Sequence, residues 1–157
     1  MKDIAELPYR VRQEDIDELG HVNNRVYLRW VEDAARTGSA LNGWTWEQYK
    51  AIGGAWVARQ HWIEYLRPCE LGDDITVYTW VEAFDGRRSL RRYAMVKKGK
   101  LCCCAATEWV FIDLATRRAV PCYPEVAACF QPVPKDDPRL KELGIARGVR
   151  WEPAGLA

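Results

Sequence analysis

The sequence predicts an α+β domain in which a long antiparallel sheet wraps around one central helix. Apolar residues recur at steps of three and four in one long segment that begins at Val26. Beyond residue 54 the period changes to two in four long segments, and short links join these segments, as in an antiparallel meander. Because a single helix cannot bury its apolar stripe alone, we expect the sheet to wrap around it.

The first half of the chain predicts one strand and two helices. Residues 7–13 (LPYRVRQ) alternate between apolar and polar, as a half-buried strand does, and a polar cluster follows at 14–24. The long helix has two candidate residues at each end, Asn23 or Asn24 as its N-cap and Gly38 or Gly43 as its stop. A short helix fits 45–52, where Thr45 and Gln48 have the spacing of a capping box before the pair Gly53-Gly54.

The second half predicts the sheet and a C-terminal extension. The four long strands are expected at residues 55–66, 75–84, 89–97 and 101–113, with a brief extra strand at 118–122. The tail is rich in proline, and one short helix in it has Asp137 as cap, Pro138 in the first turn and Gly144 past the end. With 157 residues the chain is expected to form a single domain, 1–157, with a core at about 7–122 and an extension at 123–157.

The composition is that of an ordinary globular protein, with 48% apolar and 29% charged residues and a net charge of +1. This charge gives no reason to expect nucleic acid or an anionic membrane as a partner. The start, MKDIAELPYR, lacks the apolar stretch of a signal peptide, and the longest uncharged apolar run, LCCCAA, is far shorter than the roughly 20 residues of a membrane span. Three of the six cysteines are consecutive, which suits reduced thiols better than a disulfide framework. We therefore expect a cytoplasmic protein.

Several predicted strands carry apolar residues on both faces. In the segment 75–84, Ile75, Val77 and Val81 occupy one side, whereas Tyr78 and Trp80 occupy the other. One helical layer covers only one face of a sheet. The second apolar face therefore predicts a homo-oligomer, a dimer or a tetramer.

The polar cluster DIDELGHVNNRVY at 15–27 is the main candidate for a functional site. It begins like a calcium loop, but the positions that require an oxygen ligand and a glutamate hold Leu19 and Val26, which excludes that site. The chain has only two histidines, His21 and His61, and no CxxC pair, so zinc is poorly supported. No GxSxG, P-loop or GxGxxG motif is present either.

Two interpretations of this cluster are open on local grounds. It is a polar loop with an asparagine cap, or it is a catalytic segment. Asp17 lies seven residues before Asn24, where free backbone N–H groups and the positive end of the helix dipole are expected. Such donors polarise a carbonyl group while a nearby carboxylate attacks it or activates water.

The run D-x-D-x-x-G-H-V-N-N-x-x-Y resembles the active-site segment of hotdog-fold thioesterases, in particular the branch of 4-hydroxybenzoyl-CoA thioesterase and acyl-CoA thioester hydrolases. The likeness continues in Trp30, Glu32 and Ala35-Arg36, which are similar to the central helix of the family. It extends to EYLRP (64–68) followed by LGD (71–73), and covers roughly residues 8–113. The resemblance implies a hotdog fold and thioester hydrolysis.

By this resemblance Asp17 is the catalytic carboxylate, acting as nucleophile or general base, and the backbone N–H of Asn24 is the donor that polarises the thioester carbonyl. His21 matches a histidine of acyl-carrier-protein thioesterases and would orient water or hold the loop. Those enzymes carry an asparagine where this chain has Leu19, and an acidic residue where it has Pro68. Both departures favour a CoA substrate.

Other candidates would bind substrate. Gly20, Asn23 and Tyr27 belong to the motif, and the segment RRSLRR offers Arg87, Arg88 and Arg91 for the phosphates of CoA. The arginines also suit a solvated strand edge. Four aromatic residues could border an acyl pocket or simply pack in the core: Tyr27, Trp30, Trp44 and Trp46. Glu64 lies within an otherwise apolar strand and is expected to be a buried, paired structural carboxylate.

The resemblance thus implies an acyl-CoA thioesterase that needs no cofactor and no metal, with an active site that lies between subunits as in the family. Alternatives are an acyl-carrier-protein thioesterase, a hotdog enoyl hydratase or dehydratase, and a non-catalytic acyl-CoA-binding protein. Gly20-His21 suits the hydratase, but the proline-containing loop that follows this pair in such enzymes is missing. The sequence leaves the acyl group open.

Overall fold

The computed structural model describes residues 3–150 and 154–156. The elements in chain order are β1 (Ile4–Arg10), a 3-10 turn (Gln13–Asp15), α1 (Asn24–Leu41), α2 (Trp46–Ile52), β2 (Gly54–Tyr65), β3 (Asp74–Phe84), β4 (Arg88–Lys97), β5 (Lys100–Asp113), α3 (Pro124–Ala127) and α4 (Pro138–Glu142). The five strands form one antiparallel sheet in the order β1-β3-β4-β5-β2.

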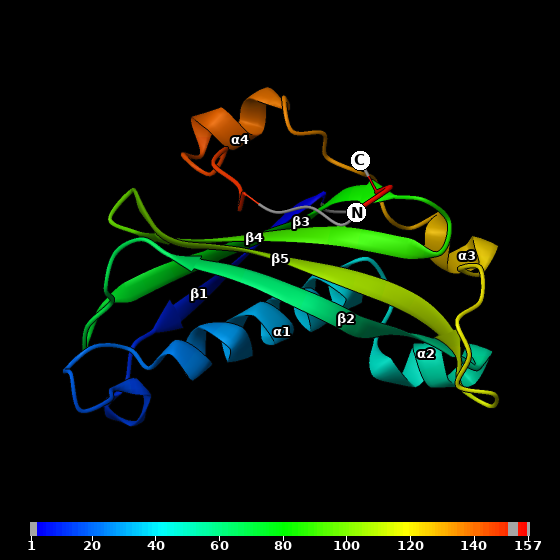
Figure 1. The fold of residues 1–157 in the computed structure, drawn as a ribbon, viewed down its shortest axis with the longest axis horizontal. Helices are drawn as coiled ribbons and strands as arrows, with labels where there is room; N and C mark the ends of the chain where they lie inside the picture. The colour runs from blue at the N-terminus through cyan, green and yellow to red at the C-terminus, as the bar shows by residue number, and fades with distance from the viewer. Residues whose placement is uncertain (1–2, 151–153, 157) are drawn as a thin grey trace.

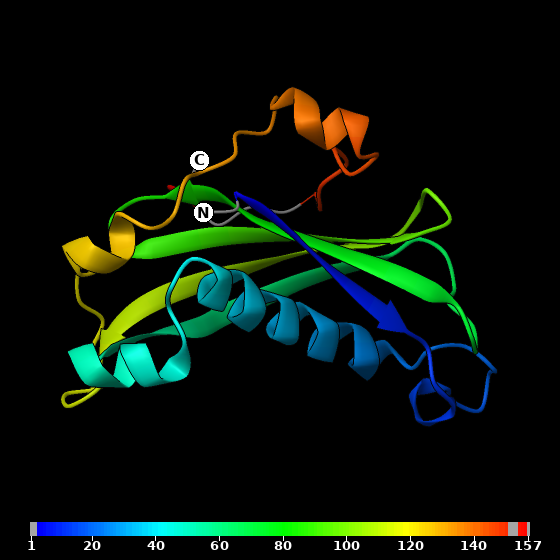
Figure 2. The ribbon, with the colours of Figure 1, turned by 180° about the vertical axis from the view of Figure 1, so that it is seen from behind.

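The sheet curves around α1, which lies across its inner face (Figures 1 and 2). Trp30, Val31 and Ala34 of α1 are almost completely buried there. The wrapped sheet buries the apolar stripe of the helix, as the pattern of the sequence requires. The predicted α+β hotdog architecture is confirmed.

The ends of α1 follow the capping rules. Asn23 is the N-cap, and its side-chain oxygen accepts a hydrogen bond of 3.0 Å from the backbone N–H of Arg25. The helix ends at Leu41, and Gly43 beyond it has a φ of +92°, a conformation that glycine adopts without strain. Gly38 does not stop the helix. Gly38 is buried within the helix, and a Cβ at this position would lie 3.0 Å from a guanidinium nitrogen of Arg91.

Both short helices predicted from their caps are present. In α2 the side chains of Thr45 and Gln48 form the reciprocal capping box, and Gly53 follows in the left-handed conformation. In α4 Asp137 caps the backbone N–H of Arg139 at 2.9 Å. These signals depend on neighbours in the sequence, so the sequence alone identifies them.

Two local predictions differ from the structure, and one short helix was not predicted. The first strand lies three residues earlier than predicted, because the buried Asp15 carboxylate accepts the backbone N–H of Arg12 and turns the chain there. The strand predicted at 118–122 is reduced to one bridge, between Ile112 and Ala119. The helix α3 carries a proline at its start but has only four residues, too few for a periodic pattern.

The C-terminal extension covers the outer face of the sheet, opposite α1 (Figures 1 and 2). Val133, Leu140 and Ile145 pack against Trp80 and Ala94, and further along Val149 and Leu156 pack against Leu90, Cys104 and Ala106. The uncovered outer face that suggested a homo-oligomer is thus absent, because the tail of the same chain packs on it, and the homo-oligomer stays a prediction.

The cysteines are small buried hydrophobes, as expected. All six are free, and only Cys129 is not buried. Within residues 3–150 and 154–156, no helix combines the length and the apolar character needed to cross a bilayer.

Candidate active site

The loop between the 3-10 turn and α1 is held by Asp15, which is 2% exposed. Its carboxylate accepts hydrogen bonds from the backbone N–H of Arg12 at 2.9 Å and from the guanidinium of Arg29 at 2.8 Å. Its backbone carbonyl accepts the N–H of Asn23 at 2.8 Å. The first aspartate of the motif therefore has a structural role, which its sequence neighbours do not reveal because Arg29 lies fourteen residues away.

Asp17 occupies a tight turn within this loop and is half-buried. Its backbone N–H donates to the carbonyl of His21 at 2.9 Å, and its carbonyl accepts the N–H of Gly20 at 3.0 Å. Gly20 has a φ of +79°, which suits glycine at this turn. Among the described residues, hydrogen bonds engage one of the two carboxylate oxygens, Oδ1, through the N–H of Leu19 at 2.9 Å.

The start of α1 is held against the end of β2 by Tyr65. The hydroxyl of Tyr65 donates to the backbone carbonyl of Asn24 at 3.3 Å, and its ring meets the edge of Tyr27 at a centroid distance of 5.2 Å. Tyr27 is buried, which raises the pKa of its hydroxyl and keeps it neutral. His21 is exposed on the same loop. The predicted residues of the motif are thus brought together at one end of α1: Asp17, Gly20, His21, Asn23, Asn24 and Tyr27.

The three predicted arginines do not form one site. Arg87 is exposed in the turn before β4, whereas Arg88 pairs with Asp85 at 2.9 Å and lies 3.6 Å from Glu108. Arg91 points to the inner face of the sheet, where it is 7% exposed. Arg88 and Arg91 therefore lie on opposite faces and cannot grip the same phosphate group.

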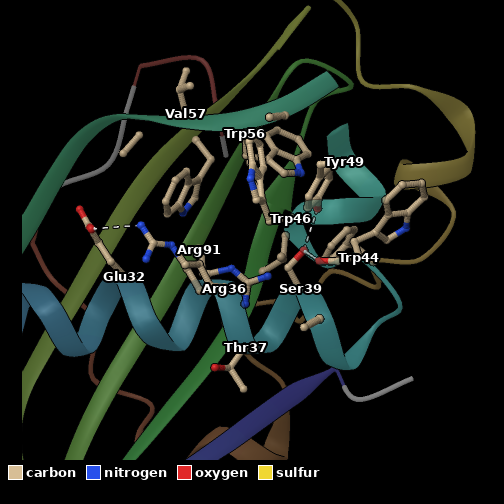
Figure 3. A pocket seen from close by; sticks show the side chains of 18 of the residues that line it. Glu32, Arg36, Thr37, Ser39, Trp44, Trp46, Tyr49, Trp56, Val57 and Arg91 are labelled. Atoms are coloured by element: carbon tan, nitrogen blue, oxygen red, sulfur yellow. Dashed lines mark hydrogen bonds and ion pairs between the residues drawn. The ribbon is translucent and has the colours of Figure 1, made fainter. Parts of the chain in front are cut away.

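A cavity of about 880 Å³ opens at the other end of α1 (Figure 3). Its walls come from the second half of α1, from α2, from the start of β2, from β3 to β5 and from the tail. Seven of its lining residues are aromatic: Trp44, Trp46, Tyr49, Trp56, Phe84, Trp109 and Phe130. We call it the aromatic cavity. Of the four aromatic residues considered for a pocket, Trp44 and Trp46 line it, and Tyr27 and Trp30 lie in the core cluster around α1.

Polar groups of the aromatic cavity form two sets. Inside it, the hydroxyl of Ser39 lies 2.7 Å from that of Tyr49 and donates to the carbonyl of Trp44 at 3.0 Å (Figure 3). On one side, Glu32 lies 3.7 Å from Nε2 of His61 and 3.9 Å from Arg36. Burial lowers the pKa of His61, although the charge of Glu32 acts in the opposite direction.

Within one chain the loop and the cavity lie far apart. The helix α1 has 18 residues and is therefore about 27 Å long. Asp17 precedes its first residue, whereas the cavity begins at Glu32 and extends beyond the end of the helix. No group of three metal-ligating side chains occurs in the part of the chain that the structure describes. The candidate reacting group of the loop is the Asp17 carboxylate, in the segment that leads into α1.

A sheet wrapped on one central helix, with an aspartate before the helix start, defines a hotdog-fold protein of the thioesterase type. The sequence model of the Thioesterase-like superfamily matches residues 11–130, and the chain belongs to this family. The predicted family and the class of thioester hydrolases are therefore confirmed.

Individual relatives agree with this assignment. The chain is 28% identical over 113 residues to the long-chain acyl-CoA thioesterase FadM of Escherichia coli, which covers 71% of this chain and 85% of that protein. The crystal structure of YbaW, a probable thioesterase from Escherichia coli, matches with 26% identity and a TM-score of 0.71 over 79% of this chain and 94% of that one. The DHNA-CoA thioesterase of Staphylococcus aureus shares the fold, with 19% identity and a TM-score of 0.75 over 90% and 95% of the two chains.

Proposed function

We propose that this protein is an acyl-CoA thioesterase that hydrolyses an acyl- or aroyl-CoA to the carboxylic acid and CoA. The observation that carries the proposal is Asp17, held in a tight turn of the loop that precedes α1. Membership of the thioesterase family and the similarity to FadM, a long-chain acyl-CoA thioesterase, support it.

In this mechanism the backbone N–H of Asn24 and the positive end of α1 polarise the thioester carbonyl and stabilise the developing oxyanion. Asp17 attacks the carbonyl carbon, or it takes a proton from the water that attacks. Attack by Asp17 forms a mixed anhydride and releases the CoA thiolate, and water then hydrolyses the anhydride to the acid. The thioester is already an activated acyl group, so the proposal requires no metal and no cofactor. His21 orients water or holds the loop.

We further propose that the active site is shared between two copies of the chain that pair through β2. This strand of 12 residues is the last in the sheet order, so one of its edges has no strand beside it among the described residues. Val57, Trp62 and Tyr65 leave between 39% and 48% of their surface exposed along it. A long edge with apolar side chains is a template for pairing. The other edge strand, β1, is shorter and contains Pro8.

Antiparallel pairing of β2 with its copy explains the distance between the loop and the cavity. The Tyr65 end of β2 contacts the start of α1, whereas Ala55, Trp56 and Val57 at the other end line the aromatic cavity. A two-fold axis near the middle of β2 brings the Tyr65 end of one copy beside the cavity end of the other. Asp17 of each copy would then act on an acyl group held in the cavity of its partner.

The six free cysteines support a reducing compartment, and we propose that the enzyme works in the cytoplasm. The covered outer face favours a dimer over a tetramer built through the backs of the sheets. The choice of acyl group is assigned in this proposal to the aromatic cavity.

The test is thiol release from a panel of acyl-CoA thioesters by the wild type and by Asp17→Asn. We expect Asp17→Asn to lower kcat by roughly 1,000-fold or more, because the reacting carboxylate is lost while the turn is kept. Glu18→Gln, on the exposed neighbouring residue, serves as the matched control and should retain kcat.

Unchanged turnover in Asp17→Asn would contradict the assignment. Ligand binding without thiol release by the wild type would favour the non-catalytic alternative. Release from acyl-carrier-protein thioesters but not from CoA thioesters would favour the other hydrolase.

A further inference from the structure

Arg91 is a buried cation on the inner face of β4, and it lines the aromatic cavity (Figure 3). Only 7% of it is exposed, and burial lowers the pKa of its guanidinium. Nη1 donates a hydrogen bond of 3.1 Å to the hydroxyl of Thr79, and the guanidinium carbon lies 6.0 Å from the ring centre of Phe130. A hydroxyl and an aromatic face are neutral partners, so they do not balance its charge.

The neighbouring Arg92 differs from Arg91 because a carboxylate neutralises its charge. Arg92, on the outer face, donates two hydrogen bonds of 3.0 Å to the two carboxylate oxygens of Glu82. Among the described residues, no carboxylate forms an ion pair with Arg91. The acidic residue of the cavity wall, Glu32, is instead directed to Arg36 and His61.

The fold makes room for Arg91 at this place. Gly38 of α1 faces it, and a Cβ on that residue would come within 3.0 Å of Nη1. The side chain of Arg91 therefore lies between α1 and the sheet, at the wall of the aromatic cavity. A buried charge without a partner is costly, and a ligand that brings the opposite charge relieves this cost.

We propose that Arg91 binds a carboxylate at the far end of the acyl group, so that the enzyme prefers ω-carboxyacyl-CoA thioesters to unsubstituted acyl-CoA thioesters. This inference rests on the proposed thioesterase function and names its substrate class. The planar guanidinium matches both oxygens of a carboxylate, and the aromatic walls take the methylene chain. A cavity of about 880 Å³ has the size of a small-ligand site and suits the acyl part of the substrate.

The phosphates of CoA are the weaker candidates for Arg91. They carry several negative charges and stay hydrated, whereas Arg91 offers one guanidinium behind aromatic side chains. Exposed arginines, such as Arg87, suit phosphates better.

The first test compares substrate pairs of equal length: adipoyl-CoA with hexanoyl-CoA, and sebacoyl-CoA with decanoyl-CoA. For the wild type we expect kcat/KM to be at least roughly 30-fold higher with the carboxylated member of the pair that fits the cavity. Arg91→Leu should invert this preference by raising kcat/KM for the unsubstituted substrate and lowering it for the carboxylated one. Arg91→Lys keeps the charge without the fork and should retain part of the preference.

Arg118→Leu is the matched control, because this arginine is exposed and does not line the cavity. It should leave the ratio within a pair as in the wild type. A wild type that prefers the unsubstituted member of both pairs, or an Arg91→Leu variant with the wild-type ratio, would overturn the proposal. So would a preference for hydroxylated aroyl-CoA over every carboxylated substrate.

The second test does not depend on turnover. Adipate and sebacate are titrated into the wild type while tryptophan fluorescence is followed, since Trp44, Trp46 and Trp109 line the cavity. We expect saturable binding of at least one diacid that weakens roughly 30-fold or more in Arg91→Leu. Absence of diacid binding overturns the inference even if thiol is released. Diacid binding by a protein that releases no thiol upholds the Arg91 site and removes the proposed hydrolysis.

Discussion

The two ends of α1 differ in how they are built. The N-terminal end consists of one continuous loop, in which Asp17, His21 and Asn24 lie within eight residues of sequence. The C-terminal end is the aromatic cavity, assembled from two helices, four strands and the tail. The reaction chemistry proposed for the first end therefore depends on a motif that is continuous in sequence, whereas the substrate choice proposed for the second end depends on side chains that only folding brings together.

The largest effect that separates the two ends is expected from mixed subunits. Asp17→Asn removes the carboxylate of one end, and Ala35→Trp fills the cavity at the other end with an indole ring. Each variant alone should retain under about 1% of wild-type activity. Mixing equal amounts after subunit exchange should restore about a quarter, because half of the dimers are mixed and each holds one complete site.

Thiol release measures this recovery, and sedimentation gives the oligomeric state of each sample. The double variant mixed with either single variant is the control and should show no recovery. No recovery in the mixture of single variants, with exchange verified, would mean that each chain uses its own loop and cavity.

A smaller effect distinguishes the two aspartates of the loop. Asp15→Asn should lower the free energy of unfolding by about 2 kcal/mol, because charged hydrogen bonds to Arg29 and to the N–H of Arg12 are weakened in a buried place. Asp17→Asn should change it by less than about 0.5 kcal/mol. Urea denaturation followed by circular dichroism checks both values. Equal stability of the two variants would contradict the division into a structural and a reacting carboxylate.

The smallest effect concerns His61 beside the aromatic cavity. Its pKa is lower in the folded chain than in the unfolded chain, so the unfolded chain binds more protons as the pH falls below about 6.5. The contribution of His61 to stability is complete above that pH and is lost as the pH falls through its folded pKa. His61→Gln should therefore flatten the fall in unfolding free energy between pH 7 and pH 5. A curve with the wild-type slope would show that other groups cause the fall.

Local signals in the sequence predicted most of the framework. The caps Asn23, Thr45 and Asp137 and the change of period beyond residue 54 identified the helices and the strands within a few residues. Asp17 was predicted as the catalytic carboxylate from a motif that is continuous in sequence, and this assignment stays a prediction. Glu64 was expected to be buried and paired: it does accept hydrogen bonds from Arg147 and from the backbone of Arg150, but it is only half-buried.

What escaped prediction depends on contacts between distant segments. Arg91 and Arg92 are neighbouring residues of the same type, yet Arg91 lines the aromatic cavity and Arg92 binds Glu82. Adjacent strand residues point to opposite faces of the sheet, and α1 covers one face while the tail covers the other. The aromatic cavity likewise joins α1 to Phe130, nearly a hundred positions further along the chain. No spacing rule connects such residues.

The C-terminal tail and the edge of β2 also differ in how concentration acts on them. The tail is tethered, so its effective concentration over the outer face of the sheet is fixed by the chain and does not change on dilution. In the proposed dimer, a second copy at β2 would be bound only while the protein concentration exceeds the dissociation constant of the dimer. Dilution in a cell that makes few copies would thus leave each chain folded under its own cover while separating the two halves of every active site. Enzyme abundance itself would then set the specific activity of each molecule.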